Sequence, residues 1–183
     1  MQQVGDAHRL LVWDSAGEWW RRGLGVPVLL PDLHRSTLQA IADRRAPLRL
    51  CYAGPVTREH FEVFCRLAWV WIRSGPGAHL VVEELADVTS PGKAPAAWGE
   101  IARKHRHYAG LVYALTQRPA ESDKTILGNA TVLHVGRMNF ASDRLYVARC
   151  LDVSQDQVDA LADLEFIERN MRTRELSRGK VTF

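Results

Sequence analysis

The sequence predicts an α/β protein with a mostly parallel central sheet and helices on its faces. Short apolar runs with β-branched residues, typical of buried strands, alternate with segments in which apolar residues recur at helical spacing. Two of these runs, 78–82 and 110–115, are joined by a Pro/Gly-rich loop and a helical segment, and each ends abruptly in polar residues. This alternation favours parallel strands connected by helices, and we expect five or more strands.

Local signals place the individual elements along the chain. Asp14 and Gly17 provide turn chemistry after the first strand. Asp32 and Thr57 are candidate N-caps, and Ser154 and Gln157 have the spacing of a capping box. The expected strands are 8–13, 48–53, 78–82, 110–115 and 131–135, with a short strand inside 23–31 and a terminal hairpin of 165–169 and 180–183. The expected helices are 33–45, 57–72, 96–107, 120–127, 142–150 and 154–162.

Length and composition indicate one domain, residues 1–183, with one substantial core. The chain has 183 residues and is 46% hydrophobic, and its 25% of charged residues is ordinary for a globular protein. A net charge of +3 permits contact with nucleic acid without indicating it. Three widely spaced cysteines lack metal-ligand spacing, and no apolar run approaches the roughly 18 residues of a membrane span. We therefore expect a cytoplasmic protein with reduced thiols and no membrane contact.

Polar residues follow two of the expected parallel strands. Glu83 and Glu84 come directly after 78–82, and Gln117 follows 110–115. Because the carboxyl ends of parallel strands meet at one edge, where open α/β sheets bind ligands, these side chains should lie close together. For any one of them a solvated loop start is the simpler interpretation. Together they predict a ligand site, with Glu84 and Gln117 no more than roughly 15 Å apart.

The amino-acid sequences at both strand ends resemble those of one known family. Residues 81–84 (Val-Val-Glu-Glu) resemble a Walker B strand, and 116–124 (Thr-Gln-Arg-Pro-Ala-Glu-Ser-Asp-Lys) resembles the TQRPAxxDK segment of FtsK/HerA-type ATPases. Small ATP-binding proteins of phages and mobile elements, including Zot-like proteins, are especially similar. A weaker resemblance extends from Arg9 to the C-terminus and includes a D-x-x-G-E-aromatic segment at 14–19. It implies a RecA/FtsK-like P-loop NTPase core with ATP and Mg²⁺ as cofactors.

The resemblance also implies roles for individual residues. Glu84 would be the general base for the attacking water, and Glu83 would hold hydrated Mg²⁺ in the nucleotide site. Gln117 would sense the γ-phosphate by contacting it. Arg118 beside it would contact the nucleotide or act across a subunit boundary. The family usually has Asp-Glu where this chain has Glu83-Glu84, although a longer side chain can still reach a hydrated Mg²⁺ ion.

One element of the family pattern is absent from the sequence. No GxxxxGK[ST] string occurs, and neither Gly92-Lys93 nor Gly179-Lys180 follows a strand with a glycine five residues earlier. In the family the P-loop and its strand come before the segment matched by 9–18. The resemblance therefore implies that this N-terminal module is missing, through truncation of the sequence, a late start codon or evolutionary loss. Without its charge neutralisation, the chain is not expected to hydrolyse ATP efficiently alone.

Partners follow from the same resemblance. Ring-forming ATPases of this type drive DNA movement or virion assembly. The resemblance therefore implies a homo-oligomer, with DNA and a phage or host protein as candidate partners. If a phage encodes the chain, the expected location is the cytoplasm of the host. Arg103 and Arg106 are candidates for trans-acting or DNA-contacting residues, although a solvated helix end explains their cluster equally well.

Two alternatives remain open. The first is a pseudo-ATPase that acts as a protein-binding or regulatory module. The second is an unrelated α/β enzyme that uses Glu83 and Glu84 in acid–base chemistry. Adjacent acids at a strand end point in divergent directions, which suits one active carboxylate better than a cooperating pair.

Overall fold

A five-stranded, fully parallel sheet forms the first part of the molecule. The computed structural model describes residues 8–43 and 48–182. The sheet has the order β2-β3-β1-β4-β5, and each neighbouring pair of its strands is parallel. Its strands are β1 (Arg9–Trp13), β2 (Val26–Val28), β3 (Leu48–Tyr52), β4 (Ala78–Val82) and β5 (Leu111–Ala114). The predicted α/β class with a mostly parallel central sheet is confirmed.

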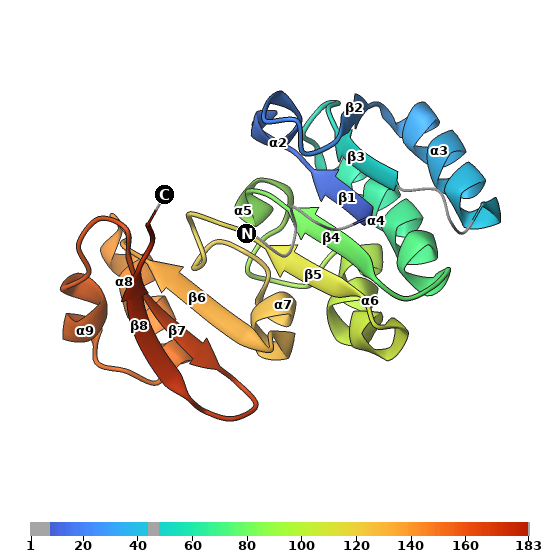
Figure 1. Ribbon diagram of the computed structural model, residues 1–183. Coiled ribbons are helices and arrows are strands. Elements are labelled where there is room, and N and C mark those ends of the chain that lie inside the picture. The colour runs from blue at the N-terminus through green and yellow to red at the C-terminus, as the bar shows by residue number, and fades with distance from the viewer. Residues whose placement is uncertain (1–7, 44–47, 183) are drawn as a thin grey trace.

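Helices lie between these strands in the chain (Figure 1). Thr57 caps the longest of them by accepting a hydrogen bond from the backbone N–H of His60, as its sequence context predicts. The helices are α2 (Glu18–Arg21), α3 (Leu30–Ala42), α4 (Arg58–Arg73), α5 (Leu85–Val88) and α6 (Ala96–Lys104), followed by a 3₁₀ turn, η1 (His105–Tyr108).

The two faces of this sheet are covered differently. On one face the large core contains Trp13, Tyr52, Phe61, Phe64 and Trp98, which join β1 and β3 to α4 and α6. The other face carries a smaller cluster, in which Trp19 of α2 and the partly buried Trp20 and Leu24 cover Leu10, Val12, Cys51 and Val81. Trp19 is therefore buried against this face of the sheet.

A separate antiparallel sheet follows in the chain. It consists of β6 (Val132–Gly136), β7 (Glu165–Asn170) and β8 (Leu176–Lys180), in the order β6-β7-β8. Val135 and Ile167 of this sheet pack with Val147 and Leu151 in a second core. The accompanying helices are α7 (Lys124–Asn129), α8 (Ala141–Leu151) and α9 (Gln155–Asp159), and α9 has the predicted Ser154–Gln157 capping box.

Contacts around α7 join the two sheets. Leu127 packs against the apolar clusters of both. Figure 1 shows α7 between β5 and the antiparallel sheet. No helix among the described residues is both long and apolar enough to span a membrane.

Two expected helix starts are wrong. Helix α3 begins at Leu30 rather than after Asp32, because Pro31 suits a first helical turn and Asp32 can favour the helix dipole from within that turn. Its expected end at Arg45 lies outside the described residues. Helix α7 begins at Lys124 rather than Ala120, because Asp123 accepts hydrogen bonds from Thr125 and Ile126 and caps it.

The terminal hairpin exists, but its second strand is earlier than expected. β8 spans Leu176–Lys180 instead of 180–183, and Glu165 pairs with Lys180. The side chain of Asn170 accepts hydrogen bonds from the backbone of Arg172 and Thr173, which closes a short turn. The long loop that the sequence suggested therefore does not form.

Candidate functional site

The carboxyl ends of β1, β4 and β5 lie together at one edge of the parallel sheet. In the strand register, Trp13 is opposite Val82, and Val82 is opposite Ala114. The residues that follow these positions therefore emerge side by side. They are Asp14 after β1, Glu83 and Glu84 after β4, and Gln117 after β5.

Glu84 contacts the segment that contains Gln117. Its Oε2 accepts a hydrogen bond from the backbone N–H of Gln117 at 3.3 Å. The predicted proximity of these two residues is confirmed. Glu84 has φ of 46° and lies in the left-handed region, which costs free energy for a residue with a Cβ. This conformation turns the chain from β4 into α5. Gln117 itself is exposed.

Glu83 faces β1 instead of β5. Its Oε2 accepts a hydrogen bond from the backbone N–H of Ala16 at 3.3 Å. Glu83 and Glu84 thus point to different neighbours, as expected for adjacent residues at a strand end. Burial raises the pKa of the Glu83 carboxyl, and the nearby carboxylates of Asp14 and Glu18 raise this pKa further, against the opposing effect of the Ala16 hydrogen bond.

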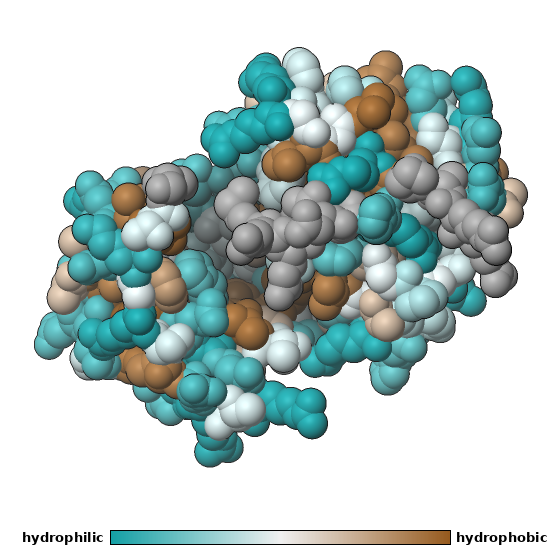
Figure 2. Space-filling view, viewed as in Figure 1, coloured by the Kyte–Doolittle hydropathy of each residue, from teal (hydrophilic) through white to brown (hydrophobic). Residues whose placement is uncertain are grey.

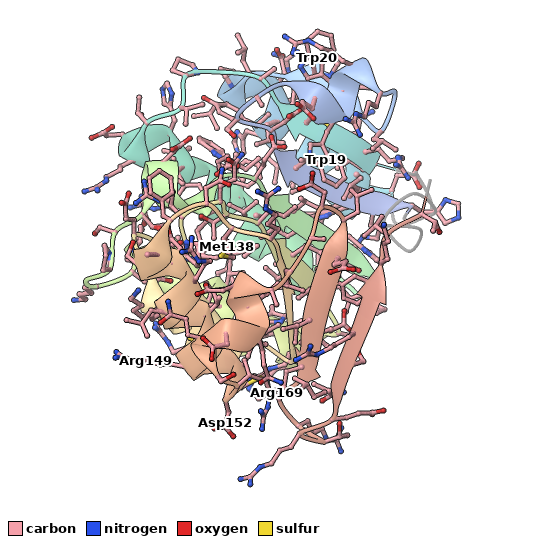
Figure 3. All side chains as sticks on the ribbon, turned by 90° about the vertical axis from the view of Figure 1, so that its left-hand side faces the viewer. Trp19, Trp20, Met138, Arg149, Asp152 and Arg169 are labelled. Carbon is pink, nitrogen blue, oxygen red and sulfur yellow. The ribbon has the colours of Figure 1, made fainter. Side chains whose placement is uncertain are left out.

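Asp14 is a further candidate site residue, although its sequence context predicts only a turn. The residue is 4% exposed, and its Oδ2 accepts hydrogen bonds from the backbone of Trp19 and Trp20, each at 3.1 Å. Its buried Oδ1 has no hydrogen-bond partner among the described residues. The available signal was its place directly after the strand next to β4. Trp19 lies toward the sheet and Trp20 at the outer edge (Figure 3).

Arg118 connects the loop after β5 to the second part of the molecule. Its Nε donates to Oδ2 of Asp143 at 2.9 Å, and its guanidinium also pairs with Glu121. The guanidinium carbon lies 4.0 Å from the ring centroid of Phe140. Asp143, whose side chain is 1% exposed, also accepts from the backbone of Ala120 at 2.8 Å. These contacts hold Arg118 in place beside Gln117.

The remaining polar residues of the loop are also engaged in structural contacts. Asp123 accepts a hydrogen bond from Nε1 of Trp98 at 3.0 Å, and its backbone N–H donates to Oγ1 of Thr89 at 3.1 Å. Lys124 donates to the carbonyl of Ala120 at 2.9 Å, and its Nζ lies 3.6 Å from the ring centroid of Tyr146. The loop is thus anchored on both sides, and Gln117 remains exposed at the site.

Arg103 and Arg106 lie away from this edge. Both are exposed, at the end of α6 and in η1, just before β5 begins. Since β5 is parallel to β4, they are at the amino end of the sheet, opposite Glu84 and Gln117. The structure therefore does not bring them to the predicted site of their own chain.

A phage protein is similar to part of the chain in sequence. No family model matches the chain. Protein P9 of Pseudoalteromonas phage PM2 is 39% identical over 108 residues, which are 59% of this chain and 50% of P9. The chain therefore spans half the length of this relative.

Solved structures resemble the chain over nearly its whole length. The genome packaging NTPase B204 of Sulfolobus turreted icosahedral virus 2, in complex with AMPPCP, has a TM-score of 0.76 and 12% identity, covering 96% of this chain and 83% of B204. The chain has the fold of a viral genome-packaging NTPase. The DNA-packaging ATPase B204 of Sulfolobus Turreted Icosahedral Virus matches with a TM-score of 0.72 and 15% identity over the same shares. At these identities the likeness establishes the fold.

The buried position of Asp143 makes its side chain important for stability. We expect Asp143→Ala to lower the free energy of unfolding by about 2–4 kcal/mol, because it leaves the Arg118 guanidinium and the Ala120 N–H without their acceptor. Asp159→Ala is the matched control, since it also removes an arginine-paired aspartate, but one whose side chain is 39% exposed. It should cost less than about 1 kcal/mol. Denaturant unfolding measures both, and equal losses would contradict the bridging role.

The raised pKa of Glu83 predicts a pH-dependent effect of Glu83→Gln. The folded state binds the Glu83 proton more tightly than the unfolded chain does. The free energy of unfolding of the wild type should therefore fall, relative to that of Glu83→Gln, as the pH rises. The fall begins near the ordinary carboxyl pKa of 4.5 and ends above the higher pKa of the folded state. Thermal unfolding measured across this range tests the sign. The change with pH in the stability difference between wild type and Glu83→Gln should be smaller in an Asp14→Asn background, because Asp14 helps to raise the pKa of Glu83. A stability difference that does not depend on pH would contradict the raised pKa of Glu83.

Proposed function

We propose that residues 1–183 form one FtsK/HerA-like, phage-type ATPase domain that couples ATP hydrolysis to DNA movement or virion assembly. The observation that carries this proposal is the convergence of Glu84, Gln117, Glu83 and Asp14 at one edge of a parallel sheet. The packaging-NTPase fold and the likeness to a phage protein support it. Leu127 and the Arg118–Asp143 pair, which join the two sheets, support treating the chain as one domain.

Glu84 is suited to act as the general base. In the proposed reaction, the oxygen of a water molecule attacks the γ-phosphorus while the Glu84 carboxylate takes the water proton. The bond from the γ-phosphorus to the bridging oxygen breaks, and ADP leaves with that electron pair. The hydrogen bond from the Gln117 backbone fixes the carboxylate, and the neutral Gln117 side chain can donate to the γ-phosphate.

Glu83 and Asp14 fit a hydrated Mg²⁺ ion. Oxygen ligands suit this ion, which usually retains several waters and binds one or two carboxylates. Asp14 has a buried oxygen that finds no hydrogen-bond partner in the described part of the chain, and the carboxyl of Glu83, whose pKa is raised, lies beside it. When bound, Mg²⁺ would neutralise charge on the phosphates. Among the described residues, no group of three or more potential His, Cys, Asp or Glu ligands is present, so the protein would supply only part of the coordination.

The open edge of β5 can receive a strand that carries a phosphate-binding loop. Within the described part of the chain, β5 pairs only with β4, and Leu111 and Leu115 are 47% and 42% exposed. Strands of parallel sheets are ordinarily covered, so an additional strand here would bury this surface and place its loop next to Gln117. The printed sequence has no GxxxxGK[ST], so residues outside it would supply the loop. Residues 1–183 alone should then be inactive.

Arg118 has a different proposed role from Arg103 and Arg106. Arg118 contacts nucleotide only if its guanidinium exchanges Asp143 or Glu121 for phosphate. In a homo-oligomeric ring, Arg103 and Arg106 can act on the site of a neighbouring subunit or on DNA, since they lie at the opposite end of β5 from their own site.

The absence of a phosphate-binding motif from the printed sequence also supports a second candidate function. A pseudo-ATPase that serves as a binding or regulatory module for a phage or host protein would keep the fold without hydrolysis. ATP turnover by the protein expressed from its complete gene distinguishes the two functions.

Replacing Glu84 tests the proposed reaction. In the protein expressed from its complete gene, Glu84→Gln should lower ATP turnover by roughly 100-fold or more, because the amide cannot take the water proton. ATP affinity should be retained, since the substitution leaves the phosphate contacts in place. Asp87→Asn is the matched control, because it removes an exposed carboxylate three residues away. Unchanged turnover in Glu84→Gln would exclude Glu84 as the base.

A further inference from the structure

The hairpin of β7 and β8 is rich in basic side chains. Between residues 165 and 180 there are five basic and three acidic residues. Arg169 is already engaged, because its guanidinium donates to the carbonyl of Leu151 and pairs with Asp152. Figure 3 shows Arg169 and Asp152 side by side. Glu168 pairs with His134, and Glu165 accepts from the backbone of Ala162.

Four further cations on this hairpin are differently placed. Arg172, Arg174, Arg178 and Lys180 are all exposed. Their side chains make no ion pair within residues 8–43 and 48–182. Glu175 is the single acid between positions 171 and 180. The end of the hairpin and β8 thus carry an excess of unneutralised positive charge, which we call the basic hairpin surface.

The backbone beneath these side chains is well ordered by hydrogen bonds. The Oδ1 of Asn170 accepts from the N–H groups of Arg172 and Thr173, at 3.0 and 3.1 Å, and the Asn170 N–H donates to the carbonyl of Glu175 at 2.9 Å. At the other end, Phe166 packs over Gly179, where a Cβ would lie 2.6 Å from the ring. Arg178 and Lys180 therefore lie about 7 Å apart along β8, and Arg172 and Arg174 lie in the turn that precedes it.

A hollow adjoins the base of this surface. It has a volume of about 440 Å³ and lies between α9 and the hairpin. Arg178 and Lys180 line it together with Gln157 and Glu165. Figure 1 shows the turn of the hairpin extending past the body of the protein, and Figure 2 shows hydrophilic residues at that end. The turn and β8 therefore present exposed basic side chains to a long polyanion.

We propose that the basic hairpin surface binds the phosphate backbone of duplex DNA. Positive charges along an exposed ribbon match the closely spaced phosphates of a duplex, and a two-stranded ribbon has the width to enter a DNA groove. Residues 169–180 contain no aromatic side chain on which unpaired bases could stack, so the surface favours a duplex over a single strand. The choice of DNA rests on the proposed function, whereas the interface itself requires neither nucleotide nor hydrolysis.

Fluorescence anisotropy with a labelled duplex of about two helical turns tests the interface in the absence of nucleotide. Two double variants of the full chain, Arg172→Gln/Arg174→Gln and Arg178→Gln/Lys180→Gln, divide the surface into its turn and its strand. Each double variant should weaken DNA binding by roughly tenfold or more at low salt. The slope of log binding constant against log salt concentration should become shallower by about 1.8, because each phosphate that is no longer neutralised reduces this slope by about 0.9. Their thermal unfolding should match the wild type, because the replaced side chains make no ion pairs with the other described residues.

Two controls separate this interface from general charge effects and from catalysis. Arg35→Gln/Arg66→Gln removes the same charge from exposed positions on α3 and α4 and should leave DNA affinity unchanged. Glu84→Gln should bind DNA as the wild type does, even if the proposed hydrolysis is disproved. Equal losses in the control pair and the hairpin variants, tighter binding of single-stranded DNA, or unaltered affinity in both hairpin variants would overturn the proposal.

Discussion

Parallel pairing in one register is the constraint on which the site depends. Because β1, β4 and β5 end at the same level, three short segments distant in sequence deliver polar side chains to one edge. Glu83 and Glu84 are adjacent in the chain, yet one contacts the turn after β1 and the other contacts the loop after β5. A shift of register would separate these side chains, because successive residues of a strand face opposite sides of the sheet.

The loop after β5 combines a structural role with a candidate chemical role. Arg118, Asp123 and Lys124 anchor it to α8, α6 and the ring of Tyr146. Two of these contacts involve fully buried carboxylates, which are stable only with their hydrogen-bond partners. The exposed Gln117 side chain is thus held on a rigid support, as a residue that reads a phosphate requires. The polar string that suggests an ATPase is therefore in large part an anchor between the two sheets.

Local signals were sufficient for features that local forces determine. The cap at Thr57, the box at Ser154 and the polar ends of β4 and β5 were predictable because each depends on residues close in sequence. Asp143 is 25 residues from Arg118, and its pairing depends on how α8 packs, which no local pattern reports. The antiparallel order of the second sheet and the burial of Asp14 likewise result from tertiary contacts.

The central claim is that nucleotide binds at the carboxyl edge with its γ-phosphate between Glu84 and Gln117. A crystal structure of the protein expressed from its complete gene, with Mg²⁺ and a non-hydrolysable ATP analogue, tests it most directly. We expect the Gln117 side chain to contact the γ-phosphate and the Glu84 carboxylate to face the position of the attacking water. Glu83 should lie on the Mg²⁺ side. A nucleotide bound at the amino end of the sheet, or beside the antiparallel sheet, would contradict it.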